Sequence, residues 1–320
     1  MTLCHVPNVP SVSRPRRLLT ALLALAAIFA VVSGCGEDPQ PRCDPAACDF
    51  VPSEAFDADR AFADVERMVA LGPRPSGSAA NAQQARMLAA ELRDAGVENV
   101  AIGKPPLLNV TGRIPGEEAG SIVVAAHHDT EDTPGFVGAN DGASGVAVVL
   151  ELARTLPNPV PGSGVAIALF DGEEARGNRD FGADGTRGSR LYVEQAADGG
   201  EPEAGIPALN QIKAMVLFDM VGDCDLQIPR EFNSNKRLYD AFSTAAGGAP
   251  FEDLTSPISD DHDPFLERGI PAVDLIDFSF GGSNTPGEYW HTTEDTVDKV
   301  CPESLDAVGE AALRAIPTLP

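Results

Sequence analysis

The segment SIVVAAHHDTEDTPGFVGANDGASGVAVVLELAR, residues 121–154, contains the pattern that decides the fold. Near its start, Ile122–Ala126 is a short run of β-branched and small apolar residues, typical of a strand buried on both faces. Val146–Leu156 is apolar on too many sides for a surface helix, so we expect an internally packed helix. A buried strand followed by a buried helix predicts one unit of a parallel α/β sheet.

The same alternation continues along the chain. Further apolar runs of strand length are Val165–Phe170, Ala214–Phe218 and Ala272–Ile276. Helical spacing of apolar residues or helix-boundary signals mark residues 56–71, Asn81–Ala95 and Pro302–Ile316. We therefore predict an α/β protein, a three-layer α/β/α sandwich with a mixed, largely parallel central sheet.

The N-terminus has the pattern of a targeting segment. Basic residues Arg14–Arg17 precede the apolar run Leu18–Val32, which is long enough for a signal peptide but short for a bilayer span. The run leads into Val-Ser-Gly-Cys, which ends at Cys35 and resembles a bacterial lipobox; an ordinary signal peptide with a free cysteine is the alternative. We expect residues 1–34 to be a lipoprotein-type signal peptide and residues 35–53 a tether. The protein would then be exported and anchored by its lipid, facing the periplasm or the exterior.

The formal net charge of −25 bears on the possible partners. An acidic surface repels nucleic acid and anionic lipid headgroups. We therefore expect no nucleic acid partner, and membrane contact only through the N-terminal lipid.

Four cysteines remain after the signal segment and the lipidation site: Cys43, Cys48, Cys224 and Cys301. They allow three pairings, between which the sequence does not decide, and disulfides persist in an exported protein. No Cys-x2-Cys pair occurs among them, so we do not interpret them as zinc ligands.

Histidines and acids gather in the turns that follow the predicted strands. In chain order these residues are His127, His128 and Asp129, then Asp141, the pair Glu173 and Glu174, Asp219, His262 and His291. The carboxyl ends of parallel strands meet at one edge of a sheet, where sites form. Imidazole and carboxylate ligands without thiolate suit zinc or a related divalent ion. His-Glu-x-x-His, Walker and Gly-x-Ser-x-Gly motifs do not occur in the sequence.

These turns, their order and their flanks resemble metallopeptidase family 28, which contains zinc aminopeptidases and glutaminyl cyclases. The resemblance runs from about Ala61 to about Ala312, and Leu71–Ser78 is similar to the family's opening stretch. It implies a zinc exopeptidase-like fold and a single zinc-dependent catalytic domain over residues 54–320, acting on peptide or protein N-termini.

The resemblance also implies a role for each residue. Three positions, His127, Asp141 and Asp219, match the ligands of one zinc ion. Asp141, Glu174 and His291 match the ligands of a second zinc, with Asp141 bridging. The general base corresponds to Glu173, and Asp129 to the partner that orients His127. His128 matches no family role, and we expect a surface or packing residue.

Two chemistries remain open within the family, and we favour the first. A glutaminyl-peptide cyclotransferase would use one zinc, convert N-terminal glutamine to pyroglutamate and release ammonia. An aminopeptidase would use two zinc ions and hydrolyse the first peptide bond. Cyclase-like features are Asp260, which matches an active-site aspartate, and Trp290, the only tryptophan, which we expect to wall the substrate pocket.

Other features are peptidase-like. The sequence of the turn Asn140–Gly145 resembles the form found in the peptidases of the family. Residues Arg179–Phe181 occupy the place where the cyclase pocket has a second tryptophan. A third hypothesis is a peptide-binding lipoprotein without activity. The presence of Glu173 argues against this hypothesis, because a protein that only binds peptides would not need to keep a general base.

Overall fold

The computed structural model describes residues 55–177 and 179–320. Its main sheet has six strands in the order β1-β2-β4-β3-β5-β8. Their bounds are β1 Glu98–Ile102, β2 Val110–Ile114, β3 Gly116–His127, β4 Val160–Phe170, β5 Ile212–Asp219 and β8 Ala272–Ile276. Strands β4, β3, β5 and β8 run parallel, whereas β1 and β2 pair antiparallel at one edge. The sheet is therefore mixed, with its parallel part at the centre, as predicted.

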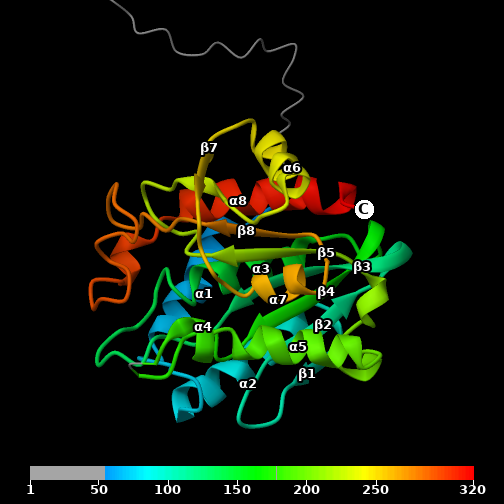
Figure 1. Ribbon diagram of the computed structural model, residues 1–320, viewed down its shortest axis with the longest axis horizontal. Coiled ribbons are helices and arrows are strands. Elements are labelled where there is room, and N and C mark those ends of the chain that lie inside the picture. The colour runs from blue at the N-terminus through cyan, green and yellow to red at the C-terminus, as the bar shows by residue number, and fades with distance from the viewer. Residues whose placement is uncertain (1–54, 178) are drawn as a thin grey trace, which may run out of the picture. The chain divides into compact units, whose positions relative to one another are not determined.

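Helices cover both faces of this sheet (Figure 1). One face packs against α1 (Ala58–Val69), α2 (Ala79–Asp94), α3 (Ser144–Thr155) and α8 (Pro302–Ala315). The other packs against α5 (Arg187–Ala197) and α7 (Asp263–Glu267). Side chains alternate along β3: Ile122 and Val124 belong to the first core, and Val123 and Ala125 to the second. Both faces of the central strands are thus buried, and the three-layer prediction is confirmed.

The helix boundaries follow local capping. Helix α1 begins after Asp57, whose side chain accepts a hydrogen bond from the backbone N–H of Arg60. Helix α2 begins after Ser78, which caps it in the same way.

Several elements have no counterpart in the sequence prediction. They are β1, β2, α4 (Phe181–Asp184), α5, α6 (Lys236–Ala246), α7 and a separate two-stranded parallel sheet of β6 (Ile228–Glu231) and β7 (Phe251–Ser256). Strand β1 is at most half-buried, and β6 is only four residues long. Neither has the uninterrupted apolar run that marks the central strands.

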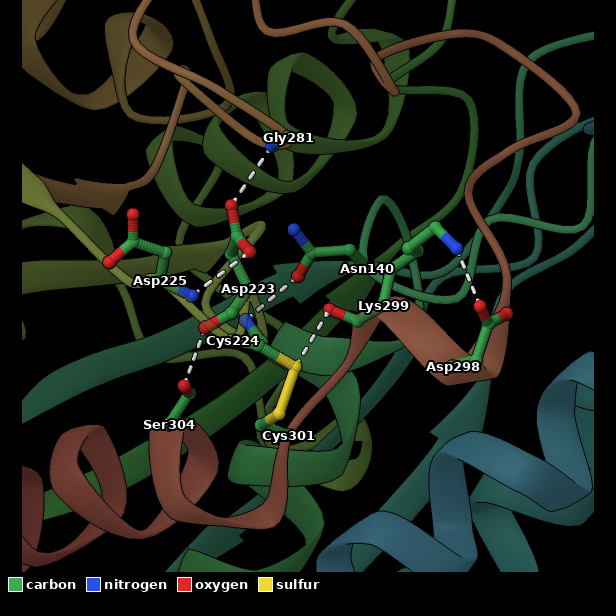
Figure 2. Close-up of a disulfide and its surroundings, with 10 residues drawn as sticks. Asn140, Asp223, Cys224, Asp225, Gly281, Asp298, Lys299, Cys301 and Ser304 are labelled. Atoms are coloured by element: carbon green, nitrogen blue, oxygen red, sulfur yellow. Dashed lines mark hydrogen bonds and ion pairs between the residues drawn. A yellow bond between two sulfur atoms is a disulfide. The ribbon is translucent and has the colours of Figure 1, made fainter.

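A disulfide joins Cys224, in the loop after β5, to Cys301, which precedes α8 (Figure 2). The same two segments also meet through a β-bridge between Asp223 and Val300 and a hydrogen bond from the Ser304 hydroxyl to the Asp223 carbonyl. The pairing that the sequence left open is decided for these two cysteines. Cys35, Cys43 and Cys48 lie outside the described residues, as do the predicted signal peptide and tether.

Within the described ranges, the structure contains no helix both long and apolar enough to cross a bilayer.

Candidate metal centre

The candidate residues meet at the carboxyl edge of the parallel strands. His127 and Asp219 are the last residues of β3 and β5. Glu173 and Glu174 follow β4 closely, and Asp141 lies in the turn before α3. Parallel strands place these ends side by side, so residues far apart in sequence converge.

One cluster is built around the imidazole of His127. Its Nε2 lies 3.1 Å from Asp219 Oδ1 and 3.2 Å from Asp141 Oδ1. All three side chains are buried, and their ligand atoms lie close enough together to hold one ion. Burial lowers the pKa of His127, but the surrounding carboxylates, Asp219 first, outweigh it and hold that pKa well above its usual value.

A second cluster is built around His291, in the loop between β8 and α8. Its Nε2 lies 3.2 Å from Glu174 Oε1 and 3.4 Å from Asp141 Oδ2. Asp141 therefore faces both clusters, one oxygen toward each. Asp141 Oδ2 and Glu174 Oε1 are buried and accept no well-aligned hydrogen bond from the described residues. Orphaned buried oxygens of this kind fit the ligands of a metal ion.

Glu173 lines the pocket and lies next to His127. Its Oε2 is 3.8 Å from Nδ1 of His127. Burial first, and then the charge of Glu174, raise the pKa of Glu173 well above its usual range. Burial and Asp141 likewise raise the pKa of Glu174 to about 8. Carboxylates this crowded are stabilised by a cation placed among them.

Asp129 contacts the backbone of the paired glutamates Glu173 and Glu174. One carboxylate oxygen accepts the backbone N–H of Glu173 at 3.2 Å, and the other accepts that of Glu174 at 3.3 Å. Its Oδ1 is also 3.8 Å from Nδ1 of His127. The structure thus shows Asp129 holding the Glu173–Glu174 turn and lying near His127, whose orientation by Asp129 stays a prediction.

Two supporting residues were missed by the sequence prediction. Asp295 is fully buried and accepts the backbone N–H groups of Asn140 at 2.8 Å and Asp141 at 3.0 Å. Arg74, also fully buried, donates to the carbonyl oxygens of Val137 at 2.7 Å and Gly138 at 3.0 Å. Together they fix the loop that carries Asp141. The Leu71–Ser78 stretch that resembles the family's opening contains Arg74, which was the available signal for it.

The backbone is constrained at the same place. Gly142 has φ +93°, and a Cβ atom there would collide with the carbonyl oxygen of Asp129. Two non-glycine residues also have positive φ at the site, His291 at 55° and Met220, next to Asp219, at 44°. Such conformations cost free energy and concentrate at functional sites.

A pocket of about 390 Å³ opens onto the two clusters. The indole of Trp290 stacks on the imidazole of His291, with ring centroids 3.8 Å apart, and Phe278 meets the indole edge-on at 5.3 Å. Arg179 and Phe181 also line the pocket. The pocket therefore has an aromatic wall next to the clusters.

Asp260 also lines the pocket, and it is buried. Its Oδ2 accepts no hydrogen bond from the described residues. Burial first, and then the neighbouring carboxylate of Asp274, raise the pKa of Asp260 well above its usual range. The structure thus brings Asp260 and Trp290 to one pocket, while their roles stay predictions.

Two histidines from the predicted turns lie outside the clusters. His128 is fully buried, with Nε2 3.2 Å from the carbonyl oxygen of Leu108, so it packs inside and the surface alternative was wrong. His262 is fully buried with its Nε2 3.1 Å from Glu231 Oε2.

An α/β sandwich with imidazole and carboxylate clusters at the carboxyl edge of its parallel strands has the architecture of a metal-dependent enzyme. The chain belongs to peptidase family M28, whose family model matches residues 109–316. It is an enzyme of this metallopeptidase superfamily.

The relatives similar to this chain include glutaminyl-peptide cyclotransferases and an aminopeptidase of Bacillus subtilis, which is 28% identical over 204 residues that cover 61% of this chain and 40% of that protein. A glutaminyl-peptide cyclotransferase of Boiga irregularis is 28% identical over 225 residues, which cover 59% of each protein. The chain thus spans about three-fifths of the length of the curated cyclotransferases it matches.

The solved structures similar to this chain also include both glutaminyl cyclases and exopeptidases. An Acidobacteriales bacterium glutaminyl cyclase is 30% identical with a TM-score of 0.72, covering 88% of this chain and 97% of that one. A Zn-dependent exopeptidase from Parabacteroides distasonis is 28% identical with a TM-score of 0.67, covering 82% of this chain and 98% of that one.

Proposed function

We propose that this protein is a zinc-dependent glutaminyl-peptide cyclotransferase, which converts N-terminal glutamine to pyroglutamate and releases ammonia. The observation that carries the proposal is the stacking of Trp290 on His291 at the pocket, beside Glu173 and Asp260. An aromatic wall against a candidate zinc ligand offers a flat face on which a side-chain amide can stack while its carbonyl faces the cluster. Similarity to glutaminyl cyclases supports the same choice.

Zinc fits the residues present. The donors are imidazole and carboxylate, and two buried carboxylate oxygens, of Asp141 and Glu174, lack other partners. In the cyclase, Asp141, Glu174 and His291 would hold the ion. Zinc would supply a Lewis acid for the carbonyl of the substrate's side-chain amide.

The protein's own groups would do the remaining work. Glu173 would take a proton from the α-amine as the amine nitrogen bonds to the side-chain carbonyl carbon. The bond from that carbon to the amide nitrogen then breaks, and Glu173 returns the proton to the departing ammonia. A carboxylate with a raised pKa suits both transfers. Trp290 and Phe278 would exclude water, which the reaction does not consume.

An aminopeptidase is the second candidate, and a specific observation favours it. The cluster of His127, Asp141 and Asp219 is as well formed as the cluster around His291, and the two share Asp141. Two zinc ions would suit this arrangement, with Glu173 as the base for an attacking water. Similarity to a Zn-dependent exopeptidase also supports it. A peptide-binding protein without activity is the least favoured, because Glu173 remains at the pocket.

We also propose that the enzyme works outside the cytoplasm, anchored through a lipid on Cys35. The support is the sequence pattern of residues 14–35, together with the Cys224–Cys301 disulfide, since disulfides persist in oxidising compartments.

The deciding experiment compares two substrates with purified, zinc-loaded protein. We expect ammonia release from a Gln-initiated peptide and no cleavage of leucine nitroanilide. The reverse result would refute the cyclase proposal in favour of the peptidase. Neither reaction, combined with tight peptide binding, would support the binding protein. Metal analysis adds an independent measurement: one tightly held zinc per chain is expected for the cyclase, and two for the peptidase.

A further inference from the structure

Glu131 lies at the second cluster, although the family resemblance gives it no role. It lies in the segment between β3 and α3, two residues after Asp129. Its carboxylate has an oxygen within 4.8 Å of ligand atoms of both Glu174 and His291. The side chain is half-buried and lines the pocket. It therefore approaches the cluster from the pocket.

The charges at this point call for a cation. Glu131 and Glu174 place two carboxylates next to His291, and Asp141 adds a third, with its Oδ2 3.4 Å from His291 Nε2. Apart from His291, the basic side chain that lines the pocket is Arg179, whose Nη1 pairs with Asp184 at 3.0 Å. Among the described residues, these acids therefore have imidazoles as their close basic neighbours, His291 beside Glu174 and Asp141, and His127 beside Asp141.

A second observation, besides the cluster of acidic residues, indicates a bound metal ion: two buried oxygen atoms lack hydrogen-bond partners. Asp141 is 3% exposed and Glu174 is 5% exposed, and each has a buried oxygen without a hydrogen-bond partner in the described chain. These are the oxygens 3.4 and 3.2 Å from His291 Nε2. They face the same cluster as Glu131. Unpartnered oxygens that converge with an imidazole are the donor set of a divalent ion.

We propose that Glu131 is a further carboxylate ligand of the ion held by Asp141, Glu174 and His291. The proposal rests on the zinc centre of the proposed function. It gives the second cluster four protein ligands, against three for the cluster of His127. The first zinc ion bound therefore goes to the second cluster. Zinc accepts a fifth ligand in catalytic sites, so a substrate carbonyl still has a position.

The test is zinc binding by the whole protein without substrate. Metal-free wild type, Glu131→Gln and Asp132→Asn are titrated with zinc against a chromogenic chelator. Asp132 is the matched control, because it is the next residue, is exposed and loses the same charge. We expect Glu131→Gln to weaken the tighter site at least about tenfold, since even partners of ligands contribute 10–100-fold. Asp132→Asn should bind zinc like the wild type.

Cobalt gives a second readout that does not depend on affinity. The visible absorption of bound Co²⁺ depends on its coordination number, so Glu131→Gln should change this spectrum and Asp132→Asn should not. Equal zinc affinity and equal cobalt spectra for wild type and Glu131→Gln would overturn the proposal. A raised KM with unchanged zinc affinity would also overturn it, and would place Glu131 against the substrate amine instead.

Asp141→Asn separates this inference from the proposed function. If Asp141→Asn loses zinc while Glu131→Gln keeps it, only the role of Glu131 fails. If Asp141→Asn also binds zinc like the wild type, the metal centre itself fails. Urea unfolding of Glu131→Gln should match that of the control, because Glu131 is half-buried in a loop.

Discussion

Removing the Cys224–Cys301 disulfide should destabilise the fold by an amount set by the loop it closes. The two cysteines are 77 residues apart. Loop-closure entropy for that separation corresponds to about 4.5 kcal/mol of unfolding free energy at 25 °C, and native disulfides are typically found to contribute about 2–5 kcal/mol. We therefore expect Cys224→Ser/Cys301→Ser to lose about 2–4.5 kcal/mol. The loop contains Asp260, Trp290 and His291, so the pocket should open earlier in denaturant as well.

The measurement is equilibrium urea unfolding followed by circular dichroism. The double variant should have a lower midpoint, and its m-value should rise because its unfolded chain is less constrained. Wild-type protein in excess reductant is the control and should unfold like the double variant, whose own curve should not respond to reductant. A loss below about 1 kcal/mol would refute the loop-entropy reasoning.

Three further predictions concern single side chains. Glu173→Gln should abolish turnover while zinc content stays at the wild-type level, and surviving activity would contradict its role as proton carrier. Trp290→Ala should raise KM about tenfold or more without loss of zinc, because it removes one wall of the pocket; unchanged kinetics would exclude the indole from substrate binding. Burial raises the pKa of Asp277 to about 6, above its unfolded value of about 3.9. The stability that this shift gives at low pH should therefore fall by about 2 kcal/mol as pH rises from 4 to 7, and Asp277→Asn should unfold without that dependence.

The central sheet could be predicted because its strands are uniform apolar runs. Val165–Phe170 and Ala272–Ile276 are buried along their whole length. Strands buried on both faces consist of apolar residues throughout, and this uninterrupted apolar run is visible in the sequence. The antiparallel edge is different. Strand β1 is partly exposed, and its pairing with β2 depends on the rest of the sheet, which local pattern does not describe.

The candidate ligands were also foreseeable, because strand ends in a parallel sheet converge. Their supports were not. Asp295 reaches the backbone of Asp141 from 154 positions along the chain. Glu131 lies close to His291 only because the two loops that carry these residues approach each other in the fold. The choice of Cys224 and Cys301 likewise depends on where those loops return. Contacts of this kind are set by tertiary structure and leave no periodic signal.

Trp290 has a practical consequence for experiments on this protein. It is the only tryptophan in the chain, and it is stacked on His291 at the pocket. Selectively excited indole fluorescence therefore comes entirely from this one place. A metal ion binding at His291, or a ligand side chain against the ring, changes the surroundings of the fluorophore directly. The unlabelled protein thus carries its own optical reporter, suitable for stopped-flow measurement of the rates at which the pocket fills and empties.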